Sequence, residues 1–176
     1  RLAADPSVAE VVAVGSDRPG IEGLARAERA GVPAFTHPLA RGADRAAWDA
    51  ELAGLIGAYE PDLVVSAGFM KLVGRDFLDA FGGRFINTHP ALLPAFPGTQ
   101  APADALAYGV KVTGATVHFV NEVPDGGEIL LQKAVEIQPG DTPETLQRRV
   151  MEQAEWKLLP QATQMISEEI RREKDQ

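Results

Sequence analysis

An amide, a hydroxyl and an imidazole occupy three consecutive positions, Asn87, Thr88 and His89. They follow a short apolar run and precede three prolines and Gly98, which exclude regular secondary structure there. In an extended backbone, Asn87 and His89 point to the same side. An amide donor beside an imidazole can hold a carbonyl oxygen and move or stabilise a proton, which suits attack on an acyl or formyl carbon. On its own, His89 could equally be a structural histidine.

A carboxylate that could serve His89 lies in the turn Pro124-Asp125-Gly126-Gly127. Asp125 can be interpreted as an ordinary turn residue. Alternatively, it reaches His89, favours the charged imidazole and fixes its orientation, which only the fold can bring about. We interpret His118, in an alternating segment, as a partly buried histidine satisfied by hydrogen bonds. His37, beside a proline, is expected to face solvent.

Composition narrows the class of protein. With 176 residues the chain is long enough for one domain with a sizeable core. The net charge of −8 argues against nucleic acid as the main partner. There is no cysteine, and the three histidines have no paired spacing, so no metal site is expected. The sequence contains no membrane span, signal peptide or phosphate-binding loop motif, and we expect a cytoplasmic protein that does not transfer phosphoryl groups.

Strands and helices are expected to alternate through the first hundred residues, which is typical of a doubly wound, mostly parallel α/β sheet with helices on both faces. A helix capped by Asp44 has the clearest apolar stripe, from Trp48 to Tyr59. Two later alternating segments predict an antiparallel addition in the C-terminal half. The expected strands are 8–16, 32–35, 63–68, 84–87, 112–120 and 129–137, and the further helices are 21–30, 75–80, 102–108 and a long segment from 143. We expect that segment to be interrupted near Pro160 and the tail 168–176 to be solvated or frayed.

Four motifs together resemble one family. They are Asn-Thr-His-Pro-Ala-Leu-Leu-Pro at 87–94, Phe-Pro-Gly at 96–98, Gly-Ala-Thr-Val-His-Phe-Val at 114–120 and Asp-Gly-Gly at 125–127. Their order and spacing resemble the formyltransferase family that uses 10-formyltetrahydrofolate, from about residue 9 to about residue 160. The resemblance implies the formyltransferase fold as a single domain over 1–176. It also implies transfer of the formyl group from 10-formyltetrahydrofolate to the primary amine of glycinamide ribonucleotide in de novo purine biosynthesis, without a metal.

The same resemblance implies a role for individual residues. Asn87, His89 and Asp125 match the catalytic asparagine, histidine and aspartate. Glu155 matches a glutamate that contacts the ribonucleotide, with Glu152 as the second choice because the spacing from Asp125 is one residue longer than usual; Pro90 is also assigned to the substrate. The implied folate-binding residues are Arg45, Met70, Lys71, Leu72, Val73, Asn121, Glu122, Val123 and Pro124. As the wall of a pteridine pocket, the apolar loop 69–74 is understandable in a soluble protein.

The resemblance also leaves alternatives and two departures, one of which is that residues 98–102 lack the histidine often found soon after the glycine that Gly98 matches. The family begins with a strand and a Gly-rich loop that are not found here, so we expect an N-terminally truncated domain that binds the ribonucleotide poorly. A formyltetrahydrofolate hydrolase or another formyltransferase of the superfamily is an alternative, and so is an inactive folate-binding module. We expect a monomer or a homodimer, with no nucleic-acid or membrane partner.

Overall fold

The strands of residues 9–176, the part described by a computed structural model, form two sheets. In the first sheet β1 pairs with β2 in parallel, and the second has the order β3-β4-β5-β6. There, β3 and β4 are parallel, whereas β4-β5 and β5-β6 are antiparallel. The bounds are β1 Val14–Ser16, β2 Ala34–Thr36, β3 Val64–Ser66, β4 Phe85–His89, β5 Val112–Phe119 and β6 Ile129–Glu136.

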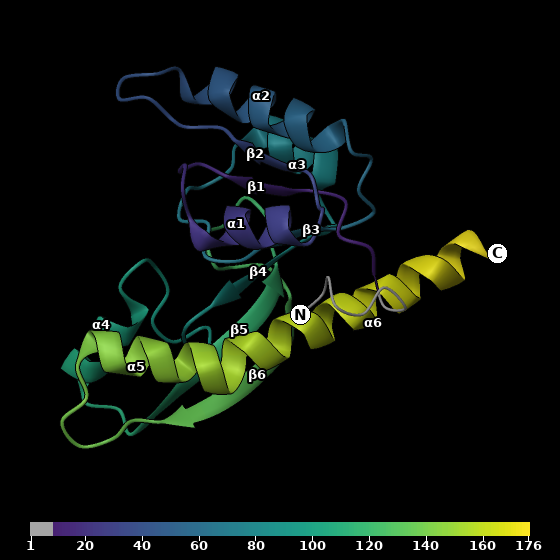
Figure 1. The fold of residues 1–176 in the computed structure, drawn as a ribbon. Helices are drawn as coiled ribbons and strands as arrows, with labels where there is room; N and C mark the ends of the chain where they lie inside the picture. Colours follow the sequence, from purple (N-terminus) through teal and green to yellow (C-terminus); the bar gives the residue numbers. More distant parts are fainter. Residues whose placement is uncertain (1–8) are drawn as a thin grey trace.

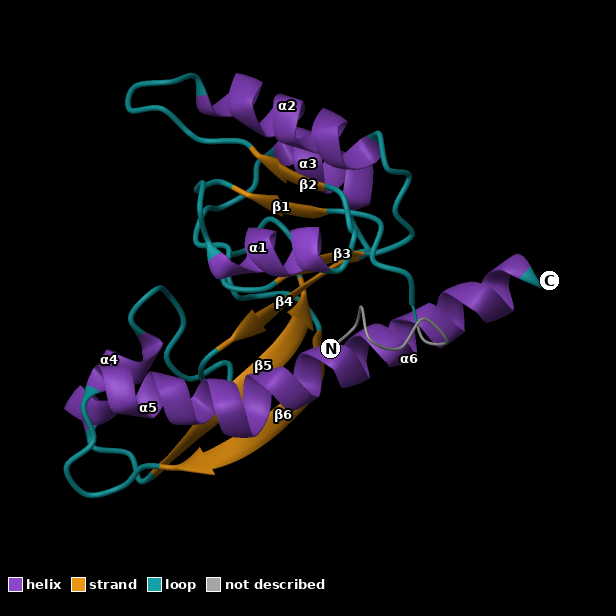
Figure 2. Cartoon of the chain, viewed as in Figure 1, coloured by secondary structure: helices purple, strands orange, loops and turns teal. Residues whose placement is uncertain are grey.

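The helices lie in two layers around these strands (Figure 1). One layer contains α2 and α3 beside the N-terminal strands, and the other contains α5 and α6, which run across β5 and β6 (Figure 2). The bounds are α1 Glu22–Arg29, α2 Arg45–Gly57, α3 Arg75–Phe81, α4 Ala101–Tyr108, α5 Pro143–Val150 and α6 Trp156–Lys174, with a π-helical turn at Met151–Glu155. The expected α/β class, with helices on both faces and an antiparallel addition, is confirmed.

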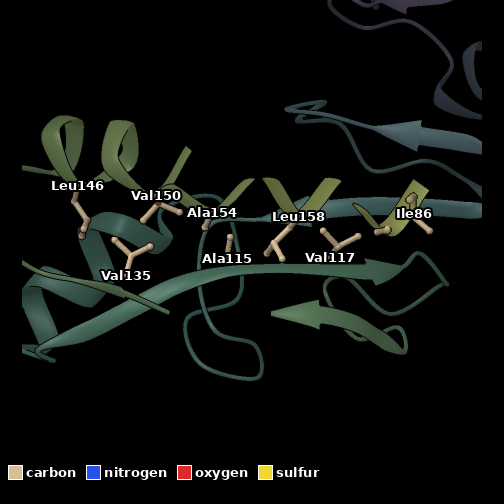
Figure 3. Packing of buried hydrophobic residues seen from close by; sticks show 9 residues of the cluster. Ile86, Ala115, Val117, Val135, Leu146, Val150, Ala154 and Leu158 are labelled. Atoms are coloured by element: carbon tan, nitrogen blue, oxygen red, sulfur yellow. The ribbon is translucent and has the colours of Figure 1, made fainter. Parts of the chain in front are cut away.

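The alternation of side chains along β4 separates two cores. Ile86 belongs to the cluster under α5 and α6, whereas its neighbour Phe85 packs with Trp48 and Phe77 under α2 and α3. Successive strand residues point to opposite faces, so one short strand serves both clusters. Figure 3 shows the first cluster, in which helical and strand side chains interdigitate. Its buried members are Ile86, Ala115, Val117, Val135, Leu146, Val150, Ala154, Leu158 and Ala162.

Most of the expected helices and strands occur, but the ends of some strands differ from the prediction because pairing with a neighbouring strand determines where a strand ends. The strand expected at 84–87 continues to His89, because the end of β4 pairs with β5. The strand expected at 8–16 is limited to Val14–Ser16, where β1 pairs with β2; residue 8 lies outside the described residues. The Asp44 cap is confirmed, since its carboxylate accepts hydrogen bonds from the amides of Ala46 and Ala47.

Of two predictions about the last helical segment, the interruption near Pro160 is wrong and the solvated tail is confirmed. The chain passes through Pro160 inside α6, and the irregularity is instead the π-helical turn Met151–Glu155. The tail 168–176 is exposed except for Ile170, as expected of a solvated segment, and it is helical to Lys174 rather than frayed. Glu173 pairs with Arg84 and Lys174 pairs with Asp62, at 2.6 Å in each case.

His37 was expected to face solvent, but it does not. Its ring stacks on Trp48 with 5.3 Å between the centroids, and only 14% of the side chain is exposed. The two residues bond reciprocally, since Trp48 Nε1 donates to the His37 carbonyl at 3.2 Å and His37 Nε2 lies 3.1 Å from the Trp48 carbonyl. The ring and the backbone carbonyl of Trp48 therefore provide the partners that a loop position did not reveal.

Helix α3 is capped from outside its own segment. Asp49, a buried residue of α2, accepts hydrogen bonds from the amides of Gly74 (2.5 Å) and Phe77 (3.0 Å). Those amides lie at the N-terminal end of α3, where a carboxylate is favoured by unpaired donors and by the helix dipole. A Cβ at Gly74 would lie 2.9 Å from the Asp49 carboxylate, so a larger residue there would displace the cap. Asp49 thereby fixes the end of the loop 69–74.

Asp49→Asn tests this cap. The substitution preserves shape but replaces one acceptor by a donor facing a backbone amide, so we expect a loss of about 2 kcal/mol in the free energy of unfolding. Urea denaturation would measure the loss. Asp79→Asn, at an exposed carboxylate of the same helix α3, is the matched control and should change stability by less than about 0.5 kcal/mol. Equal midpoints for the two variants would contradict the cap.

Among the helices of residues 9–176, none has the length and apolar character that spanning a membrane requires.

Candidate active site

Asn87 and His89 lie at the end of β4 and face the same side of the sheet. Phe85 shares this face by alternation, and it packs under α2 and α3. His89 is 4% exposed, and its Nε2 lies 2.8 Å from the carbonyl oxygen of Phe96. A carbonyl can only accept, so Nε2 carries a proton and Nδ1 is turned toward Asp125. The strand thus presents an amide and an oriented imidazole side by side.

Asp125 reaches this site from the loop between β5 and β6. Its Oδ1 lies 3.6 Å from His89 Nδ1, a distance suited to an ion pair when the imidazole is protonated but longer than a hydrogen bond. Its Oδ2 accepts a hydrogen bond from the Gly98 amide at 2.8 Å. The backbone of Asp125 is left-handed, with a φ of 54° that favours Asn, Asp or Gly. The structure therefore brings together Asn87, His89 and Asp125, which the sequence could only group by analogy.

The loop that follows β4 is held to the sheet by Thr116. Thr116 of β5 is fully buried; its hydroxyl donates to the Ala91 carbonyl at 2.7 Å and accepts from the Leu93 amide at 3.1 Å. Gln132 of β6 donates to the Thr116 hydroxyl at 3.1 Å and to the Leu93 carbonyl at 2.8 Å. These bonds hold the loop that carries Phe96 and Gly98 to the sheet.

Glu155 lies on the opposite face of β4 from the imidazole. Its carboxyl accepts a hydrogen bond from the Thr88 hydroxyl at 3.4 Å, whereas Glu152 is exposed. Burial raises the pKa of the Glu155 carboxyl above its ordinary value, and the bond from Thr88 offsets only part of that effect. Of the two candidate glutamates, only Glu155 is directed at the strand that carries His89.

The loop 69–74 is apolar and open on its outer side, with Met70 61% and Leu72 65% exposed. Its two nearby cations are engaged by the protein itself. Arg45 donates to the Leu72 carbonyl at 2.6 Å and stacks over Trp48, while Lys71 forms an ion pair with Asp17. In the described structure, Arg45 and Lys71 therefore hold this loop in place.

The second expected folate loop begins beside the first. Val120, which precedes it, packs in the same cluster as Phe69 and Val73. Within the loop, Val123 is 55% exposed and its amide donates to the Asn121 side chain at 2.9 Å. Its other residues, Glu122 and Pro124, are also exposed. Apolar side chains of both loops are thus available to a ligand.

Sequence reasoning missed several residues that shape the site. His118 is hydrogen-bonded as expected, but the sequence did not predict that its Nε2 lies 3.5 Å from Asn87 Nδ2 and 4.0 Å from Asp125 Oδ1. Thr116 and Asp17 were not selected at all. The alternating pattern of 112–120 places Thr116 and His118 on one face, and this was the available signal. Pro90, half-buried, directly follows His89.

The fold and the site define an α/β protein whose buried histidine, flanked by an amide and a carboxylate, is suited to group transfer at a carbonyl carbon. Residues 2–163 match the family described as formyl transferase, so the chain belongs to that family. It is 57% identical over 142 residues to phosphoribosylglycinamide formyltransferase of Mycobacterium tuberculosis, covering 81% of this chain and 66% of that protein. The chain thus spans just under two thirds of that relative's length.

Two further comparisons agree with this membership. The chain is 42% identical over 163 residues to the trifunctional purine biosynthetic protein adenosine-3 of Bos taurus, which covers 92% of this chain and 16% of that protein. It also resembles the crystal structure of glycinamide ribonucleotide transformylase 1 from Symbiobacterium toebii, with a TM-score of 0.87 and 48% identity. That match covers 90% of this chain and 74% of the other.

Thr116→Val tests the fixed loop. Valine preserves shape but leaves a buried carbonyl and a buried amide without their partner, so we expect a loss of about 2 to 3 kcal/mol in the free energy of unfolding. The matched control is Thr113→Val in the same strand, because the buried Thr113 hydroxyl has no hydrogen-bond partner within the described residues. That control should be neutral or stabilising. If both variants unfold at the same urea concentration, the Thr116 bonds do not stabilise the loop.

Glu155→Gln tests the buried carboxyl. Because its pKa is raised in the folded chain, Glu155 retains its proton more tightly when folded. Wild-type stability should therefore fall as the pH rises from about 4.5 through the raised pKa. The variant should equal the wild type below that window and be more stable above it, as measured by urea denaturation from about pH 4 to about pH 8. Glu152→Gln, at an exposed site, should show no such pH dependence, and a pH-independent difference for Glu155→Gln would contradict the assignment.

Proposed function

We propose that this protein transfers the formyl group of 10-formyltetrahydrofolate to the primary amine of glycinamide ribonucleotide. The observation that carries the proposal is the convergence of Asn87, His89 and Asp125 at the end of one strand in a chain of the formyl transferase family. The names of the similar proteins support the choice of acceptor. The proposal places the reaction in purine biosynthesis, in the cytoplasm, within a single domain over 1–176, in a monomer or homodimer.

The proposed chemistry is attack by the amine nitrogen on the formyl carbon. The new C–N bond forms, the bond from the formyl carbon to the folate nitrogen breaks, and one proton passes from the amine to that leaving nitrogen. Asn87 Nδ2 donates to the formyl oxygen as negative charge develops, and His89, when protonated, stabilises the same charge. A formyl oxygen at His89 would compete with the Phe96 carbonyl for the Nε2 proton. Asp125 lies 3.6 Å from Nδ1 and orients the imidazole from that side.

The loops at 69–74 and 121–124 are the proposed folate site. Exposed Met70, Leu72 and Val123 provide apolar surface for a flat ring. The backbone groups of Lys71, Val73, Asn121, Glu122 and Pro124 complete the proposed contacts. Arg45 contributes by fixing the Leu72 carbonyl, and its guanidinium is close enough to reach a folate bound there. No metal takes part in the proposed reaction.

The proposed ribonucleotide site lies beside the catalytic strand. Glu155 accepts a hydrogen bond from Thr88, so its carboxyl can accept likewise from the hydroxyls of a ribose. Glu152 is exposed, and we therefore assign the contact to Glu155. Pro90 follows His89 and has a carbonyl but no amide hydrogen, so it can only accept from the substrate amine.

His89→Ala and Asp125→Asn test the proposed roles. Each should lower turnover by about 10²- to 10⁴-fold while leaving the unfolding midpoint near that of the parent protein. The assay follows folate absorbance with 10-formyltetrahydrofolate and glycinamide ribonucleotide. Asp79→Asn, at an exposed site away from the trio, is the control and should retain full activity. Near-normal rates for both active-site variants would overturn the assignment.

The same assay without the amine separates the alternatives. Release of formate from 10-formyltetrahydrofolate at an undiminished rate would indicate a hydrolase instead. Folate binding without turnover under either condition would indicate an inactive folate-binding module.

A further inference from the structure

We propose that His118 is a positioning residue for Asn87, acting as a neutral hydrogen-bond acceptor that fixes the direction of the Asn87 amide. This inference rests on the proposed function, because it assigns Asn87 the task of donating to the formyl oxygen. An asparagine amide has two nearly isosteric ends, of which only the NH₂ end can donate. Correct donation therefore requires something that distinguishes the two ends.

The sheet register places the two side chains together. Asn87 of β4 and His118 of β5 are direct partners in the antiparallel pairing. Directly opposed residues of such a pair have their Cβ atoms about 4.5–5.5 Å apart on the same face. The pairing of β5 with β6 is irregular at this point, because Val117 opposes Leu131 and His118 opposes Ile129. A bulge of this kind redirects neighbouring side chains and is common next to active sites.

Hydrogen bonding defines the tautomer of His118. Its Nδ1 lies 2.8 Å from the Phe119 carbonyl oxygen, which can only accept, so Nδ1 carries the proton. In the neutral ring Nε2 is then an acceptor. Asn87 Nδ2 lies 3.5 Å from that Nε2, at the long end of hydrogen-bond distances. The amide donates one of its two protons to His118, and the other remains for the substrate.

The surroundings favour this neutral acceptor role over proton transfer. His118 is 2% exposed, and Asp125 Oδ1 is 4.0 Å from its Nε2, beyond hydrogen-bond reach. The same Asp125 oxygen lies 3.6 Å from His89 Nδ1, so His89 is the nearer partner of that carboxylate. A proton on Nε2 of His118 would oppose the NH₂ end of Asn87, and the amide would then have to turn its oxygen toward His118. The geometry thus places His89 nearer the Asp125 carboxylate and His118 against the Asn87 amide.

Kinetics of two His118 variants test the inference. His118→Phe preserves a buried ring without an acceptor and should lower kcat by about 10²-fold, with little change in the KM of either substrate. His118→Gln can present its side-chain oxygen to Asn87 and should recover most of that loss. If glutamine is as poor as phenylalanine although both variants fold, the acceptor role is wrong. If phenylalanine retains the parent kcat, His118 has no positioning role.

A double-mutant cycle tests whether the effect passes through Asn87. In an Asn87→Ala background, His118→Phe should cause no further loss of kcat, because the side chain that it orients is gone. A full additional loss would show that His118 acts independently, for example by supporting the core, and would overturn the inference. Thermal unfolding of all four proteins monitors the fold.

A spectroscopic measurement remains informative even if no formyl transfer is found. The ¹⁵N shifts of the His118 ring, assigned by comparison with His118→Gln, should report a neutral ring protonated at Nδ1. They should change in Asn87→Ala, which removes the donor to Nε2. A ring protonated at Nε2, or one insensitive to Asn87→Ala, would overturn the inference. Absence of turnover with the expected ¹⁵N shifts would instead refute only the proposed function.

Discussion

The antiparallel pairing of β4 with β5 is the constraint on which the site depends. This register places Asn87 opposite His118 and His89 opposite Thr116, so each proposed catalytic side chain on β4 has a polar partner on β5. A shift of one residue would turn His118 and Thr116 to the other face, into the cluster that now contains Val117. Burial of that cluster therefore fixes the register, and the register fixes the site.

The buried polar groups at this site do not destabilise the fold, because each of them has a hydrogen-bond partner. Thr116 and His118 are almost fully buried, yet their polar atoms bond to the loop after β4, to Gln132, to a backbone carbonyl or to Asn87. A buried polar network is costly when incomplete and rigid when complete. Its rigidity holds the amide and the imidazole in place before any substrate arrives, which is what electrostatic stabilisation of a developing charge requires.

The loop 69–74 is held in place by charged side chains, two of which, Arg45 and Lys71, the sequence suggested as folate-binding residues. Arg45 and Lys71 bond to Leu72 and Asp17, and Asp49 caps α3 at the end of the same loop. Two apolar residues of the loop, Met70 and Leu72, are exposed, whereas Phe69 and Val73 pack in the cluster with Trp48. Charged groups thus fix the loop while Met70 and Leu72 face outward, an arrangement suited to a flat ligand that is bound mainly by apolar contact.

The sequence alone determined the order of the elements and the identity of the chemistry-bearing strand end. Periodicity fixed α2 and its Asp44 cap, and the motif at 87–94 with Asp125 indicated formyl-transfer chemistry, because these signals are local or follow from a family pattern. Local sequence could not define the end of β4, the π-helical turn at 151–155 or the stacking of His37 on Trp48, which depend on partners distant in the chain. For the same reason, only the tertiary structure brought Asp125 to His89 and His118 to Asn87. The register between β4 and β5 decided which histidine faces the amide, and the position of the loop after β5 decided which lies nearer the carboxylate; no single segment contains either arrangement.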